Sequence, residues 1–188
     1  MKSALSSLCL CLSLLALWGC KREAELQKLY PVPDFSLTDQ TEKKVTLSDL
    51  KGRVWVADFI FTNCGGICPV MTEKMRKLHE SLPREIQLVS ITVDPDRDTP
   101  KALAAYAAEH GAPQDRWLFL TGDKQSLYNL CVQGFKLPLD ATGGTPAEPI
   151  AHSTRFVLVD QQGEIRGYYD GTEEESMTRL IHDAKSLL

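Results

Sequence analysis

Residues 53–68, RVWVADFIFTNCGGIC, contain the pattern that decides the fold of this chain. Residues 53–61 are almost entirely apolar, which is typical of a central strand buried on both faces. The loop that follows, residues 62–67, carries two glycines and Cys64. Cys68 then begins a segment with helical spacing of apolar residues, and the proline after it suits a first helical turn. The stretch therefore predicts a buried strand, a cysteine-bearing loop and a helix in direct succession.

The remainder of the chain continues the alternation of apolar strands and helices. This order is typical of an α/β protein, and a cysteine pair where the first buried strand meets its helix is the thioredoxin arrangement. We therefore predict a thioredoxin-like central sheet flanked by helices, with an N-terminal β-hairpin. The expected elements are a hairpin at 34–37 and 45–47, strands at 86–93 and 117–120, helices at 68–82, 101–110, 124–131 and 173–188, and a late hairpin at 156–159 and 165–169.

Composition limits the class of function. The chain has 188 residues, of which 43% are hydrophobic and 24% charged, as expected for one globular domain. Its formal net charge of -4 argues against binding of nucleic acid. The six cysteines do not form a multi-bridge scaffold, because half of them lie in the first twenty residues. Cys131, between two apolar neighbours, is expected to be a buried and inert thiol.

The first twenty residues resemble a bacterial lipoprotein signal. Lys2 precedes an uncharged, mostly apolar stretch at 4–18 that is shorter than the ~20 residues of a spanning helix. The sequence Leu-Trp-Gly-Cys ends at Cys20, which we expect to be the lipidated residue that anchors the chain to a membrane. An uncleaved signal anchor and plain secretion are the alternatives. All three place the domain outside the cytoplasm, and an anchored domain would lie on the periplasmic face of a bacterial membrane. We expect residues 21–32 to be a tether and residues 33–188 to be the domain.

Cys64 and Cys68 are the central candidates for chemistry. Their CxxxC spacing is one residue longer than a redox CxxC and suits two ligands on one ion. At a helix N-terminus, free backbone N–H groups and the helix dipole favour thiolate. Thiolates are the soft ligands that Cu(I) selects. The alternative is a pair of buried cysteines or a simple disulfide.

His152 is the candidate third ligand. It follows a Gly- and Pro-containing segment at 134–150, expected to be a long loop or an irregular hairpin, and opens the strand expected at 156–159. In a thioredoxin-like sheet the start of that strand lies beside the cysteine loop, so the imidazole could complete a Cys2His site. A lone histidine is more often a surface residue. Two thiolates and one imidazole suit copper in either oxidation state and also zinc, although zinc usually takes a fourth ligand.

A polar segment at residues 92–100 follows the second buried strand. Its simpler interpretation is a strand end, a turn, and Asp98 or Thr99 capping the next helix. The functional interpretation places Asp94 near the cysteines, as a docking residue or a partner of the metal ligands. On the helix after Cys68, Met71 and Met75 are expected to pack in the core rather than bind metal.

These motifs together resemble the Sco/SenC family over residues 33–188. The resemblance implies a thioredoxin-like fold that binds one copper ion, Cu(I) or Cu(II), through Cys64, Cys68 and His152. It also implies a part in building the CuA centre of cytochrome c oxidase. One departure is Gly65-Gly66-Ile67, because family members usually have proline directly after the first cysteine. The matching pieces are Asp34-Phe35 with Leu37, Asp49-Leu50-Lys51-Gly52, Phe59-Ile60-Phe61-Thr62 with the two cysteines and Pro69, Thr92-Val93-Asp94-Pro95 with Arg97-Asp98-Thr99-Pro100, and His152-Ser153-Thr154 with Asp160.

Two functions of different classes fit these features. The first is a copper chaperone that delivers copper to a cuproprotein client, for which the CuA centre of cytochrome c oxidase is expected. The second is an extracytoplasmic thiol-disulfide reductase that keeps the client's copper-ligand cysteines reduced, with Cys64 as nucleophile and Cys68 as resolving thiol. A peroxidase is disfavoured, because it needs one activated cysteine and an arginine instead of a CxxxC and His152.

Overall fold

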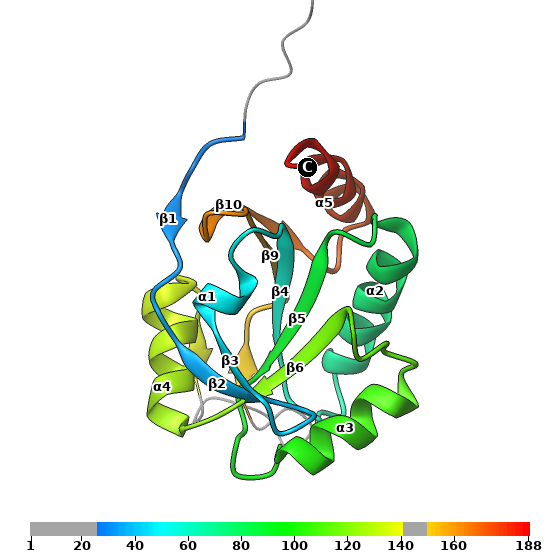
Figure 1. The fold of residues 1–188 in the computed structure, drawn as a ribbon. Coiled ribbons are helices and arrows are strands. Elements are labelled where there is room, and N and C mark those ends of the chain that lie inside the picture. The colour runs from blue at the N-terminus through cyan, green and yellow to red at the C-terminus, as the bar shows by residue number, and fades with distance from the viewer. Residues whose placement is uncertain (1–25, 141–149) are drawn as a thin grey trace, which may run out of the picture.

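The computed structural model describes residues 26–140 and 150–188 of the chain (Figure 1). The predicted signal segment, with Cys20, and residues 21–25 of the tether lie outside the described residues. Within the described ranges, no helix has the length and apolar character needed to cross a membrane.

An eight-stranded mixed sheet forms the centre of the molecule, with strand order β1-β10-β9-β4-β5-β6-β2-β3. Strands β4, β5 and β6 are parallel, and the others in the sheet pair with their neighbours in antiparallel fashion. This confirms the predicted thioredoxin-like α/β fold. The bounds are β1 Tyr30–Pro31, β2 Ser36–Asp39, β3 Lys44–Thr46, β4 Trp55–Ile60, β5 Gln87–Thr92, β6 Trp117–Thr121, β9 Arg155–Val159 and β10 Glu164–Asp170.

Helices cover both faces of this sheet (Figure 1). One face packs against the α1 and α4–η1 segments, where η1 is a π-helix, and the other against α2, α3 and α5. The predicted helices are therefore present, and α2 ends just before Pro83 as the sequence indicates. The bounds are α1 Leu47–Leu50, α2 Cys68–Ser81, α3 Pro100–Glu109, α4 Lys124–Asn129, η1 Leu130–Gly134 and α5 Glu174–Ser186.

The position of β4 explains why every residue of this strand except Asp58 is apolar. Trp55 and Phe59 belong to the cluster on the α4–η1 side, while Val56 and Ile60 belong to the cluster on the α2 side. Alternate side chains of a strand point to opposite faces, so a strand with a core on each side needs apolar residues at nearly every position. β4 then delivers the chain directly into the cysteine loop.

The N-terminal part of the described chain differs from the sequence expectation. The predicted hairpin forms as β2 and β3, and it extends the sheet at the edge of β6. Residues 21–32 were expected to be only a tether, yet Tyr30–Pro31 pairs with β10 as strand β1. Hydrogen bonds from the N–H groups of Leu29 and Val32 to β10 and its turn hold this strand in place. β1 thereby covers the open edge of β10.

The segment around residues 134–152 was expected to be a long loop or an irregular hairpin, and its described part forms the second of these. The chain leaves η1 at Gly134 and forms a separate two-stranded ribbon of β7 (Leu139–Asp140) and β8 (Ala151–His152). His152 was expected to open the strand at 156–159. It lies instead in β8, and that strand, β9, begins at Arg155. Pairing with Leu139 therefore fixes the backbone of His152 independently of the central sheet.

Candidate metal centre

The structure brings Cys64, Cys68 and His152 together at the end of β4. Cys64 lies in the loop between β4 and α2, and Cys68 is the first residue of α2. Both cysteines are buried, with exposures of 7% and 0%, whereas His152 is half-buried. One ligand atom from each residue lies within 4.8 Å of the others. The Cys68 Sγ and His152 Nε2 atoms are 3.1 Å apart.

The ring of His152 is oriented by two neighbours. Its Nδ1 lies 3.1 Å from the carbonyl oxygen of Ser153. Because a carbonyl oxygen only accepts hydrogen bonds, Nδ1 carries the proton and the lone pair of a neutral ring is on Nε2, facing Cys68. The Phe61 ring packs edge-on against the imidazole at 5.6 Å between ring centroids. Nε2 is therefore presented to the thiols in the state needed to bind a metal.

The thiols are free. The sequence predicted that the helix N-terminus favours a Cys68 thiolate, whereas in the structure the pKa of this thiol is raised. Among the described residues, Cys64, Cys68 and Cys131 form no disulfide. Burial, followed by the Cys64 thiol and the charge of Asp58, raises the pKa of Cys68 well above its usual range. Desolvation is the largest cause, because it penalises the charged form of a group closed off from water. A bound metal cation would reverse this by replacing the thiol protons.

Asp94, the candidate docking residue, is mostly buried at the end of β5. Its carboxylate pairs with the Arg97 guanidinium at 3.2 Å, and its N–H donates to the Thr92 hydroxyl. Its neighbour Asp98 contacts the cysteine loop, through hydrogen bonds from Thr62. The sequence left the cap of the next helix open between Asp98 and Thr99, and the structure assigns it to Thr99, which accepts from the N–H of Ala102.

Asp58 is a buried acid near the site that was not among the candidate residues from the sequence. Its Oδ1 accepts a hydrogen bond from the Ser90 hydroxyl at 2.6 Å, while Oδ2 has no hydrogen-bond partner among the described residues. Burial raises the pKa of this carboxyl to about 7. The signal in the sequence was the charge itself: Asp58 is the one charged residue within the six of β4.

The remaining sulfur-containing candidates are structural. Met71 and Met75 are fully buried in the cluster between α2 and the sheet, which confirms their expected core role. Cys131 is also fully buried, in η1, and burial raises the pKa of its thiol to about 12. It is a buried thiol, as predicted.

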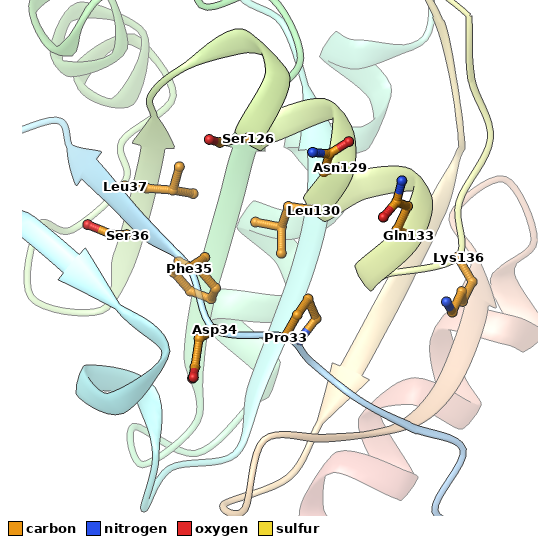
Figure 2. A pocket seen from close by; sticks show the side chains of 10 residues that line it. All are labelled: Pro33, Asp34, Phe35, Ser36, Leu37, Ser126, Asn129, Leu130, Gln133 and Lys136. Atoms are coloured by element: carbon orange, nitrogen blue, oxygen red, sulfur yellow. The ribbon is translucent and has the colours of Figure 1, made fainter.

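Two cavities flank the α4–η1 segment. One, of about 350 Å³, is bordered by His152 and has mostly apolar walls, formed by Tyr128, Val132, Pro138, Leu139 and Ala151 together with Asp140. The other, of about 610 Å³, lies between residues 33–37 and the opposite side of the same segment (Figure 2). Figure 2 shows Phe35, Leu37 and Leu130 among its walls, and none of the three candidate ligands lines it. Of these two cavities, the smaller one therefore borders the candidate metal centre, on its His152 side.

The fold and the site together define a thioredoxin-like protein with a Cys2His group where the first parallel strand meets its helix. A comparison with protein families shows which family of this class the chain belongs to. The SCO1/SenC family model matches residues 23–188, so the chain belongs to the SCO1/SenC family.

Individual relatives agree with this assignment. The chain is 38% identical over 161 residues to the SCO1 protein homolog of Bacillus subtilis, an alignment that covers 84% of this chain and 82% of the relative. It is 35% identical over 142 residues to a candidate copper-binding protein of Stutzerimonas stutzeri, covering 73% of this chain and 68% of the relative.

Solved structures show the same fold. A SCO1/SenC family lipoprotein from Bacillus anthracis superposes with a TM-score of 0.75 at 35% identity, covering 84% of this chain and 95% of that one. BsSco, described as a member of the Sco family of cytochrome c oxidase assembly proteins with a disulfide switch, superposes with a TM-score of 0.72 at 34% identity, covering 86% and 95%.

Proposed function

We propose that this protein binds one copper ion through Cys64, Cys68 and His152 and delivers it as cargo to a cuproprotein, with the CuA centre of cytochrome c oxidase as the client. The observation that carries the proposal is the convergence of two thiols and an imidazole nitrogen within 4.8 Å. Soft sulfur donors with one imidazole suit copper in both oxidation states. The copper-binding description of the Stutzerimonas relative and the oxidase-assembly description of BsSco support it.

The exposure of the three groups indicates how the cargo could leave. Both cysteines are buried, whereas His152 is half-buried and borders the apolar cavity beside Tyr128. A ligand from the client would therefore meet the ion on the His152 side. Transfer then begins with exchange of the imidazole for a client ligand, followed by release of the two sulfurs.

A thiol-disulfide reductase is the second candidate, and the free, adjacent thiols of Cys64 and Cys68 favour it. Cys64 thiolate would attack a client disulfide, and Cys68 would resolve the mixed disulfide. The client leaves with two thiols, and this chain is left with a Cys64–Cys68 disulfide. The disulfide switch described for BsSco supports reversible oxidation of such a pair.

We further propose that Cys20 is the lipidated residue that anchors the domain to the periplasmic face of a bacterial membrane, through the residues that precede β1. The description of the Bacillus anthracis relative as a lipoprotein supports an anchor of this kind. Mass spectrometry of the mature N-terminus tests it, because lipidation predicts an acylated Cys20 as the first residue.

An anaerobic copper titration of the fully reduced chain tests the main proposal. We expect one tightly bound copper per chain, lost in both His152→Ala and Cys64→Ser. Cys131→Ser is the matched control, because it removes a buried thiol that lies outside the Cys2His group. Failure of the reduced protein to bind copper tightly, together with rapid reduction of a model disulfide, would overturn the chaperone in favour of the reductase.

A further inference from the structure

Asp98 makes a dense set of hydrogen bonds beside the cysteine loop. Its side chain is 0% exposed. Oδ2 accepts from the N–H of Thr62 at 3.1 Å and from the hydroxyl of Thr92 at 2.5 Å, and Oδ1 accepts from the hydroxyl of Thr62 at 2.5 Å. Both oxygens of this carboxyl are thus used, and each is directed at a specific donor.

These bonds join three segments that meet at the same edge of the sheet. Thr62 is where the chain leaves β4 for the cysteine loop, Thr92 is the last residue of β5, and Asp98 lies just before the N-cap of α3. The N–H of Asp98 donates to the carbonyl oxygen of Asp94 at 2.9 Å, which fixes the turn that presents the carboxyl. Asp98 therefore ties the start of the cysteine loop to two elements of the core.

The position of Cys64 depends on this connection more than the other two groups do. Cys68 is held by α2, and His152 by the β7–β8 ribbon. Cys64 lies two residues after Thr62 and is followed by Gly65 and Gly66, whose backbone is unusually permissive. The glycines leave the C-terminal side of Cys64 weakly restrained, so the hydrogen-bonded Thr62 supplies the restraint from the N-terminal side.

We propose that Asp98 is a positioning residue that holds Cys64 in place against Cys68 and His152 through Thr62. This arrangement raises the effective concentration of the Cys64 thiol at the site. It favours capture of copper. It equally favours closure of a Cys64–Cys68 disulfide by exchange with a small-molecule disulfide such as oxidised glutathione, which takes the two electrons and leaves as two thiols. The copper part rests on the proposed function, whereas the disulfide part does not.

The test uses Asp98→Asn and Thr62→Val in the full chain, each with a matched control. Asp39→Asn and Thr41→Val alter the same kind of contact in the β2–β3 hairpin, where the Asp39 carboxylate accepts from the N–H and the hydroxyl of Thr41. Cu(I) affinity is measured anaerobically by competition with a coloured chelator. The reduction potential of the Cys64–Cys68 disulfide is measured in glutathione buffers, by mass spectrometry of the alkylated peptide.

We expect Asp98→Asn and Thr62→Val each to weaken Cu(I) binding about tenfold, the lower end for groups that orient metal ligands. The disulfide equilibrium constant should fall by a similar factor, which makes its reduction potential about 30 mV less negative. The control variants should stay within about twofold of wild type for both quantities, since their contacts lie outside the site. If Asp98→Asn does not fold, Thr62→Val decides, because it keeps the backbone hydrogen bond.

Two results would overturn the proposal. One is wild-type copper affinity and reduction potential in Thr62→Val, or in a folded Asp98→Asn. The other is an equal shift in the matched hairpin variants, which would reduce the effect to general destabilisation. If the wild-type chain binds no copper, the proposed function fails, and the reduction potential alone still decides the role of Asp98.

Discussion

Replacing Asp58 by asparagine should remove a pH-dependent penalty from the stability of the fold. The carboxyl is fully buried, and within residues 26–140 and 150–188 only Oδ1 has a hydrogen-bond partner, the hydroxyl of Ser90. Asparagine keeps an oxygen for that bond and is never ionised. The substitution therefore isolates the cost of burying a negative charge at this position.

The size of the effect follows from the pKa. Burial raises the pKa of Asp58 from 3.8 to about 7 in the folded protein. Between these two values the folded state keeps a proton that the unfolded chain loses, so stability falls as the pH rises. A shift of about three units corresponds to up to about 4 kcal/mol at about 1.4 kcal/mol per unit. The wild-type protein has lost this stability above about pH 7. Asp58→Asn shows no such loss, because its amide does not titrate.

Urea unfolding of both proteins across about pH 5 to pH 8 measures this difference. Asp58→Asn should gain stability relative to wild type as the pH increases. Asp160→Asn is the control with the opposite sign. Burial of Asp160 alone would raise its pKa, but N–H donors from Glu164 and Gln162 and the Arg166 guanidinium hold the pKa below its usual range. Its contribution is therefore lost only in acid, at lower pH than this window. A constant difference between wild type and Asp58→Asn across the window would refute the reasoning.

Three further substitutions test how the surrounding fold is held. Thr99→Ala removes the N-cap of α3 and should cost about 1 kcal/mol in urea unfolding, and an unchanged midpoint would contradict the capping role. Gly171→Ala would place a Cβ 2.5 Å from the Met71 sulfur and 2.7 Å from a Phe156 ring carbon, so we expect a loss of about 1–3 kcal/mol. A Gly171→Ala protein as stable as wild type would show that this corner of the core can expand. Arg116→Met leaves four backbone carbonyl oxygens near the end of α2 without their guanidinium donor and should lower the free energy of unfolding by roughly 3 kcal/mol. Thermal melts and urea curves measure it, and a loss below about 1 kcal/mol would mean that water replaces these bonds.

The sequence predicts the parts of the fold whose cause is local. The apolar run of β4 has to be buried on both faces, and Pro83 has to stop α2. The cysteine pair was placed correctly for the same reason, because it sits between a strand and a helix whose patterns are unambiguous. These elements depend on side chains within a few residues of one another.

The parts that could not be predicted are one local irregularity and two contacts between distant residues. The π-helix η1 is closed by a hydrogen bond from the N–H of Phe135 to the carbonyl of Leu130, which differs from an ordinary helical turn by one residue of register. Strand β1 forms only because β10 offers an open edge. Asp98 reaches Thr62 across 36 residues of sequence, and no local pattern marks that pairing.

The position of His152 combines both cases. The sequence expectation that it approaches the cysteine loop agrees with the structure, where its Nε2 lies 3.1 Å from Cys68 Sγ. The supporting element was different from the expected one, because the β7–β8 ribbon is too short to leave a recognisable pattern in the sequence.

Cys68 and His152 are separated by 84 residues of sequence. A copper ion bound to both, as proposed, would therefore join two distant parts of the chain. An ion held by both would close a long loop in the folded protein at a site that the unfolded chain does not offer, so its binding free energy would add to the stability of the fold. By mass action, copper at about a thousand times its dissociation constant adds about 4 kcal/mol to the free energy of unfolding. The loaded protein would then resist proteolysis, whereas the protein that has delivered its ion becomes the more easily degraded form. The rate of proteolysis would then distinguish the copper-bound protein from the copper-free protein.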